Sequence, residues 1–128
     1  MTFPMPEFTS MTGYDYKNED TMWLMDDYVD TDLVSFFSQL ITTYVKKPVK
    51  HSRCGYACSD HASWTQAGYK AAIPAEAAYR NSNPHMHTSQ DIQAHLSLKH
   101  MTDYLKLATA FAVESGEPVV QGDKHAQK

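Results

Sequence analysis

Three groups of side chains in the middle of the chain have types and spacings that could support chemistry. The segment Cys54-Gly-Tyr-Ala-Cys58 contains both cysteines, and Asp60-His61 follows directly. Further along, His85-Met-His87 places two imidazoles two residues apart. Imidazole is the commonest metal ligand in proteins, and thiols and carboxylates also bind metals or move protons. We therefore expect the functional side chains of this chain to lie in this region.

The two cysteines allow two interpretations. Cys54 and Cys58 could form a disulfide across a small loop, which is typical of an oxidising compartment, or remain reduced thiols. A closed structural zinc site needs four ligands, and the chain has no second cysteine pair. The spacing alone leaves both interpretations open.

The histidine pair is equally open to two interpretations. If the segment is extended, His85 and His87 point to the same side, where both could approach a metal. If the segment is a surface loop, neither ring needs a ligand role. An H-x-H pair without further context does not decide between these possibilities.

Other polar residues have structural explanations. Asp60 can cap a helix, with His61 as a partly buried donor, and Glu76 could pair with Arg80 at helical spacing or orient a ligand. The sequence contains no G-x-S-x-G motif and no cluster of glycines, which argues against an α/β-hydrolase serine site and against a phosphate-binding loop.

The elements that must position these residues alternate between strands and helices. Apolar runs predict short strands over 21–25 and 69–73, the second ending at a proline. Helical spacing predicts helices over 32–47 and 97–116, and good caps predict a short helix over 62–67. This order predicts an α/β fold. In the last helix, the expected apolar stripe consists of Leu98, Met101, Tyr104, Leu105, Ala108, Phe111 and Ala112.

Composition limits the class of protein. The 128 residues suffice for one domain, and 42% hydrophobic residues with 20% charged residues are typical of a globular chain. The net charge of −4 gives no basic face for a nucleic acid. The sequence contains no run of about 18 apolar residues, so it predicts no membrane span.

Several motifs together resemble the C-terminal part of the secreted bacterial leucyl aminopeptidases of metallopeptidase family 28. The resemblance extends from about residue 11 to 116. It depends chiefly on Cys54-Gly-Tyr-Ala-Cys-Ser-Asp-His-Ala-Ser-Trp64 and Asn83-Pro-His-Met-His-Thr-Ser-Gln-Asp91, supported by Met11-Thr-Gly-Tyr14, Asp27-Tyr-Val-Asp30 and Ala67-Gly-Tyr69.

The resemblance implies part of a three-layer sandwich of the zinc exopeptidase type, with a mixed β-sheet and flanking helices. Such enzymes release N-terminal, preferably large apolar, residues from peptides by means of a water activated by a pair of zinc ions. His87 matches a zinc ligand, His85 matches none, and Cys54 and Cys58 match a disulfide. Tyr56 matches a tyrosine that could donate a hydrogen bond to the developing oxyanion.

The resemblance also implies a hydrophobic cup for the side chain of the N-terminal substrate residue. Related enzymes often have aromatic residues at the positions of Ala75 and Ser82, so we expect a roomier cup here. The matching positions are Met11, Met25, Cys54, Tyr56, Cys58, Ile73, Ala75, Tyr79, Ser82 and Met86.

The departures from the family are as informative. The first histidine ligand, the bridging aspartate and the general-base glutamate have no counterpart in this chain, and Ser10 stands where an aspartate ligand is expected. We therefore expect 1–10 to be an irregular lead-in, 11–116 to be the C-terminal portion of the catalytic domain, and 117–128 to be a polar tail. The isolated chain should bind zinc weakly at most and lack peptidase activity.

The alternative hypothesis is a non-catalytic peptide-binding or interaction module derived from an aminopeptidase. In either case the expected partner is a peptide, with no nucleic acid or membrane. Self-association through an uncovered sheet edge is a further expectation. The resemblance and the cysteine loop indicate a secreted or extracellular protein.

Overall fold

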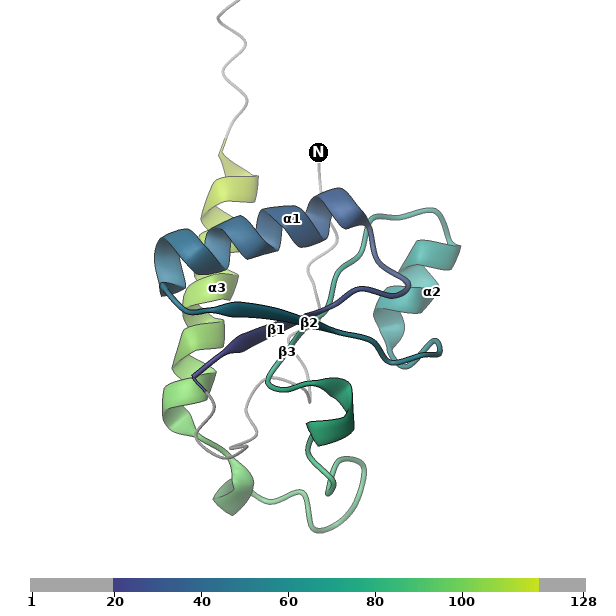
Figure 1. Ribbon diagram of the computed structural model, residues 1–128, viewed down its shortest axis with the longest axis vertical. Coiled ribbons are helices and arrows are strands. Elements are labelled where there is room, and N and C mark those ends of the chain that lie inside the picture. The colour runs from purple at the N-terminus through teal and green to yellow at the C-terminus, as the bar shows by residue number, and fades with distance from the viewer. Residues whose placement is uncertain (1–19, 118–128) are drawn as a thin grey trace, which may run out of the picture.

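A small mixed sheet organises the structure. The computed structural model describes residues 20–117. Its strands are β1 (Met22–Met25), β2 (Val49–Ser52) and β3 (Pro74–Ala75), in the order β2-β1-β3. β1 pairs with β2 in parallel and with β3 antiparallel, so the expected mixed sheet with flanking helices is confirmed (Figure 1).

The helices begin where the sequence supplies caps. α1 (Thr31–Leu40) starts after Asp30, whose carboxylate accepts the backbone N–H of Leu33 at 2.9 Å. It continues into the π-helical turn η1 (Ile41–Val45), which ends at Lys46 in a left-handed conformation (φ 59°). The long helix α3 (Leu98–Gly116) starts after Ser97, whose hydroxyl accepts the N–H of His100.

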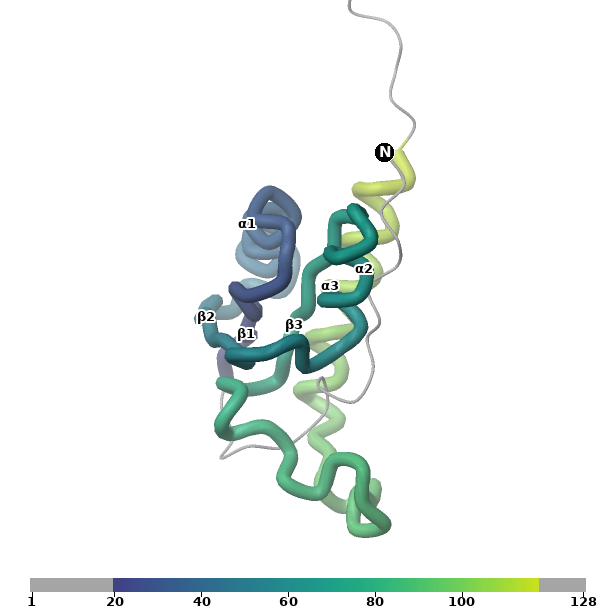
Figure 2. The backbone as a smooth tube through the Cα atoms, turned by 90° about the vertical axis from the view of Figure 1, so that its right-hand side faces the viewer, coloured from purple at the N-terminus to yellow at the C-terminus, as the bar shows by residue number. Residues whose placement is uncertain are grey.

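Shorter helices complete the chain. α2 (Asp60–Gln66) follows Ser59, and Gly68 just beyond it has a φ of +89°, which fits the expected glycine stop. Two 3-10 turns, η2 (Tyr79–Asn81) and η3 (Gln93–His95), lie in the long connection to α3. Figure 2 shows the whole path of this connection from β3 to α3.

The two faces of β1 belong to different clusters, because successive side chains of a strand point to opposite sides. Met22 and Leu24 pack with α1 and α3 in the main core, where Phe37 stacks on Phe111 with ring centroids 4.8 Å apart. Met25 belongs instead to a smaller cluster on the other side, which contains residues expected in the substrate cup.

One prediction about the sheet was wrong, and one strand was not predicted. Residues 69–73 are not a strand; the chain pairs with β1 only at Pro74 and Ala75, and Pro74 is tolerated there because it stands first in the strand. β2 was not predicted, because its sequence Val-Lys-His-Ser is polar and its two central residues are exposed.

The orientation of the last helix also differs from the prediction. Tyr104 and Phe111 are buried as expected, but Leu98 and Leu105 are exposed. Asp103 takes a buried position because the ammonium of Lys47 lies 3.4 Å from its carboxylate. Consequently part of the apolar stripe faces outward. Within residues 20–117, no helix is long and apolar enough to cross a membrane.

Candidate functional site: a disulfide loop, an apolar cup and a histidine loop

The cysteine segment forms a closed loop. Cys54 and Cys58 are joined by a disulfide, which settles the choice that the spacing had left open. Gly55 has a φ of +85°, a conformation that L side chains rarely adopt. The loop therefore needs glycine at this position.

Asp27 fixes the disulfide loop to the end of β1. Its two carboxylate oxygens accept the backbone N–H groups of Cys54 (3.1 Å) and Gly55 (2.7 Å). Its backbone carbonyl oxygen lies 3.2 Å from Nε2 of His61 on α2. The His61 side chain is buried. Burial lowers the pKa of His61, so its neutral form donates this hydrogen bond. Sequence reasoning assigned Asp27 no such role, although it lies in a motif of the resemblance.

Several residues predicted to form the cup lie together on the side of the sheet opposite the main core. Met25, Ile73 and Ala75 form a buried cluster, and Cys54, Tyr79 and Met86 pack against it. Cys58 is joined through the disulfide, and the backbone N–H of Ser82 donates to the carbonyl of Tyr79 at 3.1 Å. Met11 lies outside the described residues.

Tyr56 meets a second tyrosine. Its hydroxyl lies 2.5 Å from that of Tyr79, and the rings pack edge to face with centroids 5.9 Å apart. The hydrogen bond with Tyr56 raises the pKa of Tyr79. The backbone N–H of Tyr79 also donates to the hydroxyl of Ser52 at the end of β2. Tyr56 is 53% exposed, so its hydroxyl is held at the surface beside the cup.

His87 lies in an exposed turn of the next loop, with a left-handed backbone (φ 64°). Asn83, which is only 5% exposed, anchors this loop. Its side-chain amide donates to the carboxylate of Asp91 (2.8 Å), and its side-chain oxygen accepts the N–H of His85 (2.9 Å). His85 stacks on His95 with ring centroids 4.2 Å apart. Sequence reasoning missed the anchoring role of Asn83.

Glu76 is fully buried next to Ala75 of β3, so it does not form the surface pair with Arg80 that helical spacing allowed. Among the described residues, no hydrogen-bond partner of good geometry reaches either carboxylate oxygen. Burial raises its pKa to about 7, and backbone groups of Glu76 and Asn83 offset only part of this effect. Glu76 is therefore a buried titratable group directly after β3, with a pKa raised to about 7.

The described residues do not make a metal site by themselves. Between residues 20 and 117, no three His, Cys, Asp or Glu side chains are grouped so that they could hold a metal ion. His87 alone does not fit a zinc ion, which needs several ligands. Ser10, at the expected position of a further ligand, lies outside the described residues.

The model of peptidase family M28 matches residues 9–112, which include both motif segments and the cup. The chain belongs to peptidase family M28.

Similar proteins from fungi carry the name leucine aminopeptidase 1. The protein from Penicillium rubens is 40% identical over 109 residues, which are 81% of this chain and 28% of the relative. The protein from Grosmannia clavigera is also 40% identical, over 81% of this chain and 27% of the relative. This M28 chain therefore spans little more than a quarter of their length.

Solved structures support the same membership. The LapA aminopeptidase of Legionella pneumophila is 50% identical with a TM-score of 0.77, and the match covers 81% of this chain and 28% of LapA. LapB of the same organism is 45% identical with a TM-score of 0.79, covering 84% and 30% respectively. Thus fungal and bacterial proteins share this part of the M28 fold.

Proposed function

We propose that this chain forms the C-terminal part of the catalytic domain of a zinc-dependent aminopeptidase. Activity would belong to the complete domain, and the 128-residue chain alone would be inactive. The observation that carries the proposal is the small apolar cluster of Met25, Ile73 and Ala75, bordered by the disulfide loop and by Tyr79 and Met86. An apolar cluster with a few polar groups at its rim suits the side chain of an N-terminal residue.

Each part of the site has a proposed task. The cup would hold the first side chain of a peptide, with a preference for large apolar residues because Ala75 and Ser82 are small. Tyr56 would donate a hydrogen bond to the carbonyl oxygen under attack. His87 would provide one zinc ligand in the complete domain. The described residues do not bring a ligand set together, so any metal-dependent step would belong to the complete domain.

An exchange with LapA tests the site residues. The part of LapA that corresponds to residues 20–117 would be replaced by these residues, leaving the other LapA residues in place. We expect the chimera to hydrolyse leucine p-nitroanilide, and His87→Ala to reduce the rate at least 100-fold by removing a ligand. His85→Ala is the matched control and should leave the rate unchanged. Equal loss in both variants, or no loss in either, would contradict the role of His87.

The isolated chain gives the complementary test. We expect the purified 128-residue protein to contain less than one zinc per chain and to leave leucine p-nitroanilide intact. Metal analysis that finds a stoichiometric zinc pair together with hydrolysis would overturn the proposed inactivity.

The substrate preference can be tested in the same chimera. Ala75→Phe would fill the cup, since Ala75 is buried and contacts Met25 and Ile73. We expect kcat/KM for phenylalanine p-nitroanilide to fall at least tenfold relative to alanine p-nitroanilide. An unchanged ratio would show that the first side chain binds elsewhere.

A non-catalytic peptide-binding module is the second candidate. It is supported by the buried apolar cluster at the expected cup positions, together with the lack of a metal-ligand group among residues 20–117. Calorimetry of the isolated chain with leucyl-glycine separates the two: binding that is lost in Ala75→Phe supports the module. The disulfide supports an extracellular location for either function, because such bonds persist in oxidising compartments.

A further inference from the structure

Tyr79 is firmly anchored at the edge of the small apolar cluster. Its backbone N–H donates to the hydroxyl of Ser52 at 3.0 Å, and its carbonyl accepts the N–H of Ser82 at 3.1 Å. Its ring packs against the buried cluster that contains Met25. The backbone and the ring of Tyr79 are therefore both held in place before any ligand arrives.

Tyr56 is restrained much less. It lies within the disulfide loop between Cys54 and Cys58, and its side chain is 53% exposed. An exposed side chain on a loop normally samples several rotamers. Here the ring of Tyr56 meets that of Tyr79 edge to face at an interplanar angle of 75°, and the two hydroxyls lie 2.5 Å apart. The orientation of the Tyr56 phenol therefore depends on Tyr79.

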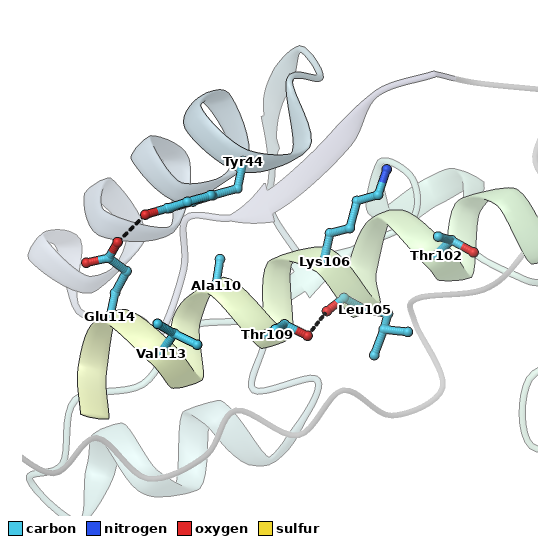
Figure 3. Close-up of a pocket in the computed structure, with 8 residues that line it drawn as sticks. All are labelled: Tyr44, Thr102, Leu105, Lys106, Thr109, Ala110, Val113 and Glu114. Carbon is cyan, nitrogen blue, oxygen red and sulfur yellow. Dashed lines mark hydrogen bonds between the residues drawn. The ribbon is translucent and has the colours of Figure 1, made fainter. Parts of the chain in front are cut away.

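The contact between the two phenols uses only part of their hydrogen-bonding capacity. Two hydroxyls carry two hydrogens, and the contact between them needs one. Tyr44 shows the contrast, since its hydroxyl donates its single hydrogen to the carboxylate of Glu114 (Figure 3). That donor is used within the chain, whereas one hydrogen of the tyrosine pair is not used by the contact between Tyr56 and Tyr79.

The direction of the hydrogen bond decides which tyrosine keeps this hydrogen. The contact with Tyr56 raises the pKa of Tyr79, as expected where the neutral phenol of Tyr79 is the donor. The hydrogen of Tyr56 then stays available for another acceptor. Successive hydrogen bonds polarise one another, so a hydroxyl that accepts one hydrogen bond becomes a stronger donor of the next.

We propose that Tyr79 is a positioning residue for the aminopeptidase reaction. Its hydroxyl donates to the phenolic oxygen of Tyr56, which fixes the Tyr56 ring and leaves its hydrogen for the substrate carbonyl oxygen under attack. The role of Tyr79 rests on the proposed function, since it depends on Tyr56 donating to that oxygen. A phenylalanine of nearly the same shape could line the cup but could not perform this task.

The chimera of residues 20–117 with the rest of LapA tests this role. Tyr56→Phe should lower kcat for leucine p-nitroanilide about 100-fold, because it removes a donor to the oxyanion. Tyr79→Phe keeps the ring in place, so kcat should fall about tenfold while KM changes less than about twofold. The double variant should be as active as Tyr56→Phe, because Tyr79 acts only through Tyr56.

Tyr69→Phe is the matched control. Tyr69 is 57% exposed and packs edge to face on Trp64, outside the cluster that contains Met25, so kcat and KM should both stay unchanged. A loss from Tyr79→Phe that is equally large with and without the Tyr56 hydroxyl would overturn the proposal. A change in KM alone would do the same, because it is expected if Tyr79 only lines the cup.

The contact itself can be measured in the full 128-residue chain without any activity. NMR of the chain with isotope-labelled tyrosine follows the titration of each phenol. We expect Tyr56→Phe to lower the pKa of Tyr79, because the hydrogen bond that raises it is lost. An unchanged pKa of Tyr79 would overturn the proposal, whatever the chimera does.

The two measurements together separate the role of Tyr79 from the proposed function. If Tyr56→Phe slows the chimera and Tyr79→Phe does not, only the role of Tyr79 is wrong. If NMR shows the contact but Tyr56→Phe leaves kcat unchanged, or the unmodified chimera is folded but inactive, the proposed function is wrong and the role of Tyr79 falls with it. Thermal melting of each variant verifies that the fold is retained.

Discussion

Glu76 should make the stability of this protein fall as pH rises from acid to mildly alkaline values. Burial raises the pKa of this carboxyl from 4.5 to about 7. Between these pH values the folded state holds a proton that the unfolded state has released, so rising pH favours unfolding. A difference of about 2.5 between the pKa values of the folded and unfolded states corresponds to a total loss of about 3.4 kcal/mol once the pH is well above both values. Integration from pH 5 to pH 8 gives a loss of about 2.5 kcal/mol.

Replacement of the carboxyl by an amide isolates this effect. In the Glu76→Gln variant this side chain cannot ionise. Between pH 5 and pH 8, the free energy of unfolding of the variant should therefore fall by about 2.5 kcal/mol less than that of the unmodified chain. Urea unfolding of both proteins at both pH values measures this difference. Subtraction of one protein's pH dependence from the other's removes the contributions of the histidines, which both proteins share. Glu117→Gln, at an exposed position, is the control and should behave like the unmodified chain. Identical pH dependence in the unmodified chain and Glu76→Gln would refute the reasoning.

Three further changes test other parts of the structure. Leu107→Ala should lower the free energy of unfolding by about 3 kcal/mol, because Leu107 is fully buried in the main core; a loss below about 1 kcal/mol in urea unfolding would contradict this. Reduction of the Cys54–Cys58 bond should cost about 2 kcal/mol from loop closure alone, seen as a lower melting temperature with reductant, and no decrease would argue against a restraining role. Asn83→Ala should speed amide hydrogen exchange at His85 roughly tenfold by removing its acceptor, and unchanged exchange would show that the loop is held elsewhere.

The helices were predictable because their signals are local. Asp30 and Ser97 cap α1 and α3 through contacts only three residues long, and the apolar spacing fixes the helical period. The apolar run over 21–25 predicted β1. β2 and β3 were not predictable, because β2 is polar and β3 has two residues, so neither has a pattern of its own. The buried face of α3 was partly misassigned for a similar reason: Leu105 is as apolar as Leu107, and only tertiary contacts decide which is covered.

Part of the candidate site was predictable, but its support was not. Motif resemblance implied the disulfide between Cys54 and Cys58, which the structure contains, whereas the cup positions and the ligand role of His87 stay predictions. It did not indicate that Asp27 holds the disulfide loop or that Asn83 holds the histidine loop. Each of these contacts joins a side chain to backbone groups in a loop without regular structure. Such contacts depend on the folded path of the chain and leave no periodic signal in the sequence.

The division of β1 between two clusters has a consequence for how the cup is held together. The main core behind Met22 and Leu24 contains thirteen buried residues, whereas the cluster around Met25 contains three. Three buried side chains bury too little apolar surface to fix long loops against their conformational entropy. The arrangement of the smaller cluster must therefore depend on the specific loop restraints, namely the disulfide and the hydrogen bonds of Asp27 and Asn83. It follows that loss of a restraint should loosen the smaller cluster while the helices stay folded, so that the proposed peptide binding and the stability of the fold should respond to different residues.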